Sequence, residues 1–411
     1  MQKNADFIPV LLGADLNCYS VARAFHEAYG VTSYAFGKYA LGTTKNSRIV
    51  HFQAVAGLDD DGIALRALID FAEAHPDRAL LVMGCTDEYA EFLIRHRGEL
   101  ERYYLVPYMK AELVDGLIDK ADFYESCEKF GIPYPKTRVV SGVLSADELS
   151  PEALGFDYPL IVKPSSSIAY WRHPFPDMQK VYVARTQDEA HSILEKIYAS
   201  GYDRRVIIQD MIPGGDDRMR VLTVYSDKNC RVRMMCIGHV LLEEHTPKGR
   251  GNHAAIIVEP LPEIADKIEA MLNTLGVRGF TNFDLKLDTR DGTLKAFEIN
   301  LRQGRSNHYL TASGINVGRL VADDYVYNLD LPTVREGNPT FWHSVPRRVV
   351  YRYTEDEGAV LLAKSLAREG KTASPLRYAP DLRGNLWRRF YVFETMRRHY
   401  KKYRTYCQRM R

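Results

Sequence analysis

Three oxygen-bearing side chains occur on two segments whose patterns predict a β-hairpin, and together they suit a hard cation. Apolar and polar residues alternate over 281–287 and again over 294–299, with an Asp-Gly turn between them. A period of two places Glu298 and Asn300 on one face, and the partner strand brings Asp284 beside them. Magnesium prefers such oxygen ligands, completed by phosphates and water. The simpler alternative is a solvated hairpin face, and spacing alone does not choose between the two.

Two upstream lysines supply positive charge that anionic phosphates need. Lys120 lies near the start of an expected helix over 118–130, which Gly131 ends. Lys163 closes an expected strand and precedes a small-residue polar loop that contains Ser165. A lysine in that position can meet nucleotide phosphates as a point charge.

Strand and helix patterns alternate through the first 115 residues or so. The expected elements are strands at 7–12, 31–36 and 79–83 and helices at 19–29, 64–74 and 88–96. This alternation predicts a mainly parallel, doubly wound sheet. Gly13 and Gly84 follow strands, where backbone donors can meet an anion. Neither segment is Gly-x-Gly-x-x-Gly, so simple turn chemistry is favoured over ligand contact.

Composition excludes several classes of protein. The 411 residues suffice for two or three domains, and 45% hydrophobic with 26% charged residues is ordinary for a soluble globular chain. The net charge of +2 makes nucleic acid an unexpected partner of the chain as a whole. Six dispersed cysteines without a Cys-x-x-Cys pair argue against zinc and dense disulfides. Without a long apolar run, we expect a cytoplasmic protein, neither exported nor membrane-spanning.

Four segments together resemble the ATP-grasp carboxylate-amine ligases. They are Lys120 before Gly-Ile-Pro-Tyr-Pro-Lys-Thr, then Leu-Ile-Val-Lys163-Pro, then Ile-Ile-Gln209-Asp-Met-Ile-Pro-Gly, and finally Asp284 with Glu298-x-Asn300. The resemblance implies a mixed α/β and α+β fold, in which a doubly wound N-terminal domain precedes two antiparallel-sheet subdomains that hold ATP between them. The implied divisions are 1–115, 116–214 and 215–335, followed by a C-terminal extension, 336–411.

The resemblance also assigns roles to residues. Lys120, Lys163 and Ser165 would contact the phosphates. Adenine would face the interdomain strand that contains Gln209, Asp210 and Ile212, and Asp217 or its neighbour Asp216 would bind the ribose. Mg²⁺ would be held by Asp284, Glu298 and Asn300. One departure is the serine run 165–167, where many relatives have glycines. The sequence therefore does not decide whether this loop closes over the phosphates.

Such ligases activate a carboxylate with ATP, forming an acyl phosphate that an amine then converts to an amide. Arginines neutralise the charge that develops in phosphoryl transfer. Arg302 and Arg305 follow the metal residues, and Arg302 shares their strand face if the strand continues. We predict catalytic roles for both, against the alternative of surface arginines. Predicted substrate contacts are Arg220, His253 and Ser306, for which sheet-surface or loop positions without ligand contact are the alternatives.

The opening segment, residues 7–30, is similar to that of the D-aspartate ligases of peptidoglycan synthesis. This similarity implies transfer of D-aspartate through its β-carboxylate to the lysine side chain of the UDP-linked muramyl pentapeptide (UDP-MurNAc-pentapeptide). Two alternatives stay open: a ligase that joins free amino acids into a dipeptide, and a nucleotide-binding regulator without turnover. The complete set of metal and arginine residues argues against the regulator.

The C-terminal segment, 383–411, combines ten Lys or Arg residues and several aromatic residues with one acid, Glu394. Spacings of three or four predict one stripe of a helix. Its members are Leu386, Phe390, Phe393, Met396, Tyr400, Tyr403 and Cys407. Three interpretations stay open: docking on the body or on a second subunit in a homo-oligomer, peripheral contact with an anionic membrane, and a nucleic-acid patch.

Overall fold

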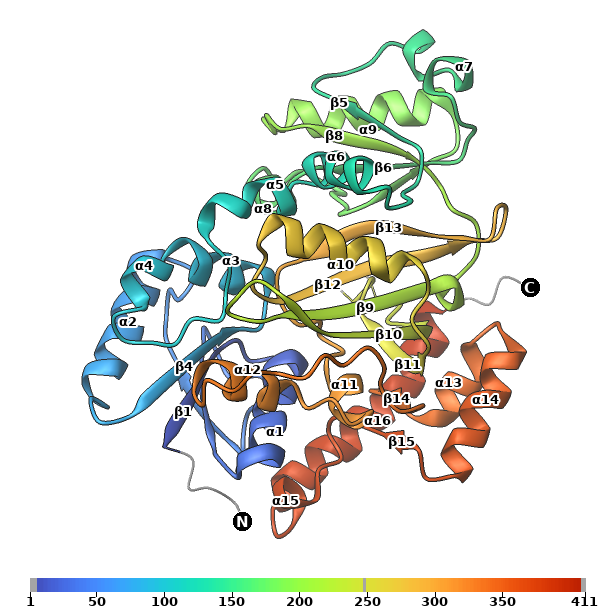
Figure 1. The fold of residues 1–411 in the computed structure, drawn as a ribbon. Helices are drawn as coiled ribbons and strands as arrows, with labels where there is room; N and C mark the ends of the chain where they lie inside the picture. The colour runs from blue at the N-terminus through green and yellow to red at the C-terminus, as the bar shows by residue number, and fades with distance from the viewer. Residues whose placement is uncertain (1–5, 247–248, 408–411) are drawn as a thin grey trace.

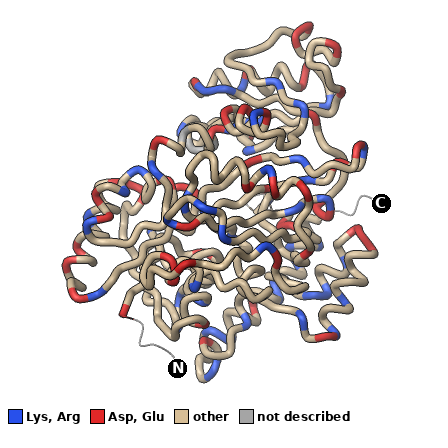
Figure 2. Tube along the Cα trace, in the orientation of Figure 1, with Lys and Arg blue, Asp and Glu red and all other residues tan. Residues whose placement is uncertain are grey.

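Residues 6–246 and 249–407 are described by the computed structural model, and within them the strands form three sheets (Figure 1). A parallel sheet comes first along the chain, and two mainly antiparallel sheets follow it. Lys and Arg are interspersed with Asp and Glu along most of the trace, in agreement with the small net charge (Figure 2). No helix in this described part is both long and apolar enough to cross a membrane.

The N-terminal domain has a four-stranded parallel sheet in the order β3-β2-β1-β4. Its elements are β1 (Phe7–Leu12), α1 (Leu16–Tyr29), β2 (Ser33–Gly37), β3 (Val50–Ala54), α2 (Asp61–Glu73), β4 (Ala79–Gly84), α3 (Asp87–Arg95) and α4 (Arg97–Leu100). Every residue of the apolar strand β1 is buried, as expected for a strand covered on both faces. Asp15 caps α1 by accepting hydrogen bonds from the backbone of Asn17 and Cys18.

The smaller ATP-grasp-like subdomain has a four-stranded antiparallel sheet in the order β5-β8-β6-β7. Its strands are β5 (Thr137–Val140), β6 (Leu160–Pro164), β7 (Tyr182–Ala184) and β8 (Val206–Asp210). Helical elements that precede or accompany them are η1 (Ala111–Leu113), α5 (Asp115–Ile118), α6 (Lys120–Phe130), η2 (Asp147–Leu149), α7 (Pro151–Leu154), α8 (Ser167–Trp171) and α9 (Gln187–Ala199). This subdomain forms the upper part of the molecule in Figure 1.

A seven-stranded sheet, ordered β13-β12-β9-β10-β11-β14-β15, forms the centre of the molecule. Its strands are β9 (Met219–Ser226), β10 (Val232–Glu243), β11 (His253–Glu259), β12 (Gly279–Asp288), β13 (Thr293–Asn300), β14 (Phe341–His343) and β15 (Thr372–Ala373). The associated helices are η3 (Asp216–Arg218), α10 (Ile264–Leu275), α11 (His308–Ala312), α12 (Val317–Tyr325), α13 (Arg347–Tyr353), α14 (Glu357–Arg368), α15 (Ala379–Leu382) and α16 (Leu386–Tyr406). The last two strands come from 336–411, the expected extension.

Both faces of this central sheet are buried, which fixes the N-terminal domain against it. Along β9, Leu222 and Val224 belong to the core that includes α10. The alternate residues Val221 and Tyr225 belong to the core shared with α1, α11 and α12. Because successive strand side chains point to opposite faces, one strand joins both cores. The doubly wound domain is therefore held beside the hairpin β12–β13.

Some expected elements differ from the observed ones. The helix expected over 118–130 is divided into α5 and α6, so Lys120 begins a new helix that Asp119 caps. Arg218 lies in the helical turn η3, directly before β9. The strand β3 was not predicted, because its residues are largely exposed and polar and give no buried-strand pattern. The fold class itself is as predicted.

Candidate active site

The expected hairpin forms, and it sets two carboxylates directly opposite one another. Asp284 on β12 pairs with Glu298 on β13, and Asn282 pairs with Asn300. Burial and the neighbouring Glu298 carboxylate raise the pKa of Asp284 to about 8. The surrounding lysines lower the pKa of Glu298, despite its burial. Near neutral pH Glu298 is therefore ionised, whereas burial and the Glu298 charge favour the protonated form of Asp284.

Three lysines from three different segments surround Glu298. Lys120 places its Nζ 3.3 Å from Glu298 Oε2, and Lys180, in the loop before β7, places its Nζ 3.9 Å from Oε1. Lys163 lies on β6 and donates a 3.0 Å hydrogen bond to the Tyr124 hydroxyl. Burial lowers the pKa of Lys163 to about 8, whereas Glu298 raises the pKa of Lys180. Such a cluster of cations can neutralise phosphate oxygens.

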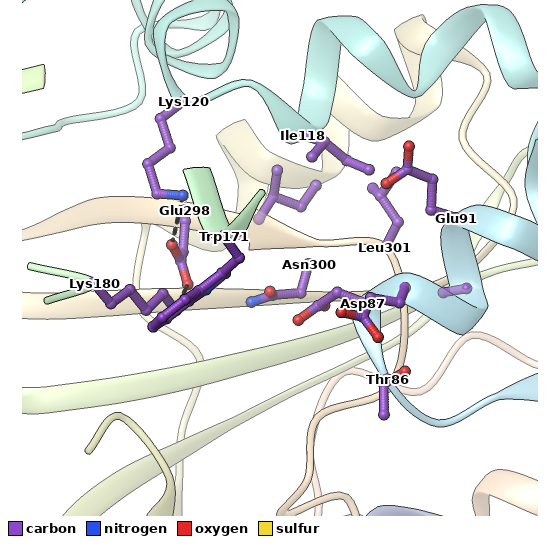
Figure 3. Close-up of a pocket in the computed structure, with 13 residues that line it drawn as sticks. Thr86, Asp87, Glu91, Ile118, Lys120, Trp171, Lys180, Glu298, Asn300 and Leu301 are labelled. Carbon is purple, nitrogen blue, oxygen red and sulfur yellow. Dashed lines mark ion pairs between the residues drawn. The ribbon is translucent and has the colours of Figure 1, made fainter. Parts of the chain in front are cut away.

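A cavity of about 420 Å³ opens between α3 of the N-terminal domain and the end of β13 (Figure 3). Lys120 and Lys180 reach Glu298 from one side, with the Trp171 ring beside them, while Asp87 lies near the opposite end. Its walls are formed by Thr86, Asp87, Glu88, Ala90, Glu91, Ile118, Lys120, Trp171, Lys180, Glu298, Ile299, Asn300 and Leu301. Of the site residues predicted from the sequence, Lys120, Glu298 and Asn300 line this cavity.

The residues predicted to bind the rest of the nucleotide lie outside the cavity lining. The Gln209 amide donates to Thr137 Oγ1 at 2.7 Å. Arg290 binds the Asp210 carboxylate in a bidentate manner. The Ile212 carbonyl accepts a 2.9 Å hydrogen bond from a lysine on β12. Asp217 is buried in η3. Their contacts to adenine and ribose stay predictions.

Ser165 is fully buried, and its hydroxyl donates a 2.8 Å hydrogen bond to the Asp119 side chain. The Lys120 amide also donates to the Ser165 carbonyl, at 3.3 Å. In this arrangement the serine joins the loop after β6 to the start of α6. Ser165 thereby positions Lys120, and its contact with phosphate stays a prediction.

Arg302 lies beyond the end of β13, because that strand stops at Asn300. The strand does not continue to Arg302, so the condition for Arg302 to share the strand face of Glu298 is not met, and its catalytic role stays a prediction. Its guanidinium instead binds Asp87 at the start of α3, with Nε 2.7 Å from Oδ1 and an Nη nitrogen 3.0 Å from Oδ2. Arg305 lies 3.3 Å from a Glu244 oxygen and 3.8 Å from Asp15.

The loop that carries both arginines is fixed to the N-terminal domain by buried amides. Asn17 Nδ2 donates to the carbonyls of Cys85 and Gln303, at 2.8 and 3.1 Å. Gln303 Nε2 donates to the Gly84 carbonyl, and Asn307 Nδ2 donates to Asn17 Oδ1 at 2.7 Å. The arginine loop is thus positioned by Asn17, at the start of α1, and by the carbonyl of Gly84, at the end of β4.

The predicted substrate residues are separated from one another. Arg220, on β9, forms an ion pair with Glu259. His253 begins β11, where its Nε2 lies 3.7 Å from Glu243 and 3.9 Å from Asp284, and burial lowers its pKa to about 4. Ser306 is buried in the arginine loop. Only His253 is placed beside the carboxylate pair, and all three substrate contacts stay predictions.

Sequence reasoning missed Lys180, Trp171 and Asp87 as site residues. Trp171 ends α8, which directly follows the serines that departed from the glycine pattern, and Lys180 lies in the loop before β7. No local sequence pattern marked either residue as part of the site. Asp87 follows Gly84 by three residues, and its position as the first residue of α3 was a weak signal. Only the tertiary packing brings it to Arg302.

Comparison with known proteins identifies the family. A D-aspartate ligase from Enterococcus faecium (strain Aus0004) is 37% identical over 410 residues, which is 98% of this chain and 97% of the relative. The chain belongs to the D-aspartate ligase family. No protein-family model matches the chain. The family assignment confirms the predicted enzyme class, an ADP-forming ATP-grasp ligase that makes carbon–nitrogen bonds.

Solved structures show that this D-aspartate ligase family member has the ATP-grasp fold. An L-amino acid ligase from Bacillus licheniformis superposes with a TM-score of 0.55 at 17% identity, covering 79% of this chain and 75% of that one. The biotin carboxylase domain of Hydrogenobacter thermophilus 2-oxoglutarate carboxylase, in complex with MgADP, ADP and bicarbonate, gives a TM-score of 0.59 at 15% identity, with coverages of 81% and 73%. The second of these structures contains ADP and magnesium.

The donor set fits a magnesium ion. Asp284 and Glu298 face one another on paired strands, Asn300 lies on the same hairpin, and the raised pKa of Asp284 marks repulsion that a divalent cation would relieve. Within the described residues, no three His, Cys, Asp or Glu side chains gather as a metal-binding group. Two carboxylates and an amide therefore leave positions for phosphate oxygens and water, as magnesium prefers.

Proposed function

We propose that this enzyme uses Mg-ATP to join the β-carboxylate of D-aspartate to the lysine side chain of the UDP-MurNAc-pentapeptide. The observation that carries this proposal is the 37% identity to a D-aspartate ligase along nearly the whole of both chains. The presence of a carboxylate pair, three lysines and two arginines supports turnover, because a regulator has no evident need for all of them. Of these residues, Lys120, Lys180 and Glu298 line the cavity.

In the first step, a substrate carboxylate oxygen attacks the γ-phosphorus of ATP, and the bond from that phosphorus to the bridging oxygen breaks to release ADP. Lys120, Lys163 and Lys180 would neutralise the phosphate oxygens. Asp284, Glu298 and Asn300 would hold Mg²⁺, which supplies charge neutralisation when bound. The product is an acyl phosphate.

In the second step, the acceptor ammonium first gives a proton to water, and the resulting neutral amine attacks the acyl carbon. The carbon–oxygen bond to phosphate breaks, and the departing phosphate takes up the second proton of the amine as the amide forms. Asp87, Glu88 and Glu91 line the cavity wall opposite the lysines. Negative charge there favours arrival of the acceptor as an ammonium ion. Arg302 and Arg305 would bind the substrate carboxylate that does not react.

A cytoplasmic site of action is part of this proposal. All six cysteines are free thiols, which suits a reducing compartment. A UDP-linked peptide is also a cytoplasmic form of the cell-wall precursor.

The test measures phosphate release from Mg-ATP over D- and L-amino acids, each with and without the UDP-MurNAc-pentapeptide. We expect release that requires both D-aspartate and the pentapeptide, together with a product heavier by one aspartyl residue. Glu298→Gln, which removes one metal carboxylate, is the control for background hydrolysis. No release with any pair, from protein that still binds ATP, would refute turnover.

A second candidate is the joining of two free amino acids, which the structural likeness to the L-amino acid ligase favours. Release with a pair of free amino acids and none with the pentapeptide would select it. The arginine loop suits either reaction, because one or two arginines recognise any free carboxylate.

A further inference from the structure

The C-terminal helix α16 is docked on the body of the protein along one face. Arg388, Val392, Met396, His399 and Tyr403 are the residues that this face buries. Arg388 Nε lies 3.0 Å from Asp381 Oδ2, with both side chains fully buried, and the Tyr403 hydroxyl donates a 2.6 Å hydrogen bond to the Glu243 carbonyl. The docking expectation is thus confirmed, and the helix is held in a fixed orientation.

The face that docks differs from the predicted apolar stripe. The predicted stripe placed Leu386, Phe390, Phe393 and Tyr400 together with the buried Met396 and Tyr403, but these four side chains are exposed. The arginine at 388 and the histidine at 399 occupy the inward positions instead, because a buried aspartate and a nearby tyrosine ring accept the Arg388 guanidinium. The apolar residues are displaced to the outside.

The outward face therefore begins with a concentration of exposed apolar surface. Leu386 and Trp387 are each 74% exposed, Phe390 is 63% exposed and Phe393 is 65% exposed. Six of the eighteen large hydrophobic side chains that are exposed in the described residues lie on this one helix. At 100° per residue, Leu386, Phe390 and Phe393 lie on a single side. A cluster of this kind marks a contact surface.

The outward face continues with positive charge. Exposed cations of α16 are Arg389, Arg397, Arg398, Lys401, Lys402 and Arg404. The single acid of the helix, Glu394, is shared between Arg397 and Arg398, at 2.7 and 2.9 Å. Lys401 and Arg404 project on the same side as Phe390, and the described residues provide no ion pair for either of them.

We propose that this outward face of α16 is a peripheral membrane contact that binds anionic lipid. Phe, Trp and Leu side chains enter the interfacial region of a bilayer, while neighbouring cations bind lipid phosphates. A second copy of the chain fits less well, because parallel pairing of two such faces opposes like charges and antiparallel pairing sets apolar residues against cations. The contact goes beyond the proposed reaction and does not depend on its substrates.

The experiment is flotation of the full-length protein with vesicles of phosphatidylcholine alone or mixed equally with phosphatidylglycerol. We expect binding to the anionic vesicles alone, lost when salt is raised to about 0.5 M, where screening shortens to a few Å. Each cation near an anionic surface contributes a factor of about five in affinity, so Lys401→Glu with Arg404→Glu should weaken binding at least about 25-fold. Phe390→Ser with Phe393→Ser should weaken it as well.

Matched controls lie on the smaller subdomain, at the opposite end of the molecule from α16 in Figure 1. Val139→Ser with Val143→Ser removes exposed apolar side chains, and Arg185→Glu with Lys196→Glu reverses exposed charges. Neither control should change vesicle binding, and all variants should keep the wild-type melting temperature and ATP turnover.

Equal binding to both vesicle types, or no binding to either, would overturn the proposal. Two further results would also overturn it. A dimer that the Phe390→Ser, Phe393→Ser variant dissolves would identify a second copy as the occupant. Binding of single-stranded or duplex nucleic acid without vesicle binding would assign the patch to that partner.

Discussion

Replacement of the two lysines that reach Glu298 tests the cation cluster quantitatively. Lys120→Met and Lys180→Met remove charges of equal size at 3.3 and 3.9 Å from the same carboxylate. They differ in solvent screening, because the Lys120 side chain is 10% exposed and that of Lys180 is 56% exposed. The buried charge should therefore matter more to a phosphate in the same cavity.

The magnitudes follow from Coulomb's law. Two unit charges about 4 Å apart interact by roughly 4 kcal/mol at an effective dielectric constant of 20 and by roughly 1 kcal/mol in bulk water. The buried Lys120 interacts with an energy near the larger of these values, so Lys120→Met should lower kcat/KM for ATP by about 100- to 1,000-fold. The interaction energy of Lys180 lies nearer the smaller value, so Lys180→Met should lower it by about 10- to 30-fold.

The assay is coupled ADP release at varied ATP concentration, with both amino-acid and acceptor substrates saturating. Lys196→Met, an exposed lysine on α9, is the control and should leave kcat/KM unchanged. Thermal unfolding should show that all three variants fold. If kcat/KM for ATP falls as much or more in Lys180→Met than in Lys120→Met, the screening argument is refuted. If it falls less than twofold in both variants, the lysine cluster has no role in catalysis.

Three further outcomes are expected. Glu298→Gln should lower turnover by about 100-fold or more with the fold intact by circular dichroism, because a metal ligand and its charge are lost; a near-normal rate would refute the metal assignment. Burial lowers the pKa of Lys163 to about 8, so the lysine is charged below that pH and kcat/KM for ATP should fall as pH rises through about 8. In Lys163→Arg, whose side chain stays charged, kcat/KM should not fall over this pH range. Asp381→Asn should lower the free energy of unfolding in urea by about 3–5 kcal/mol, because it leaves the buried Arg388 charge unpaired; a change under 1 kcal/mol would contradict this.

The N-terminal domain contributes more than a scaffold. Its α3 supplies the Asp87 carboxylate to Arg302, and Asn17 at the start of α1 and Gly84 at the end of β4 bind the loop that holds both arginines. A substrate carboxylate that binds Arg302, as proposed above, would therefore compete with Asp87 for its guanidinium. This arrangement links the position of the doubly wound domain to the chemistry at the end of β13.

The sequence by itself determined the parts of the site that arise from local pattern. Alternation and the Asp-Gly turn specify the hairpin, and a period of two sets Glu298 and Asn300 on one face, because side-chain direction in a strand depends only on position. The family resemblance likewise depended on short local segments, and the full-length comparison confirmed it.

Only the tertiary structure decided which groups from distant segments meet. Asp87 and Arg302 are 215 positions apart, and no periodic pattern relates them. Lys180 reaches Glu298 through the fold of its loop, and the buried Asp381 turns Arg388 inward, which exposes the apolar residues of α16. Propensity and periodicity describe neighbours along the chain, whereas these choices depend on which charge lies buried across the interface.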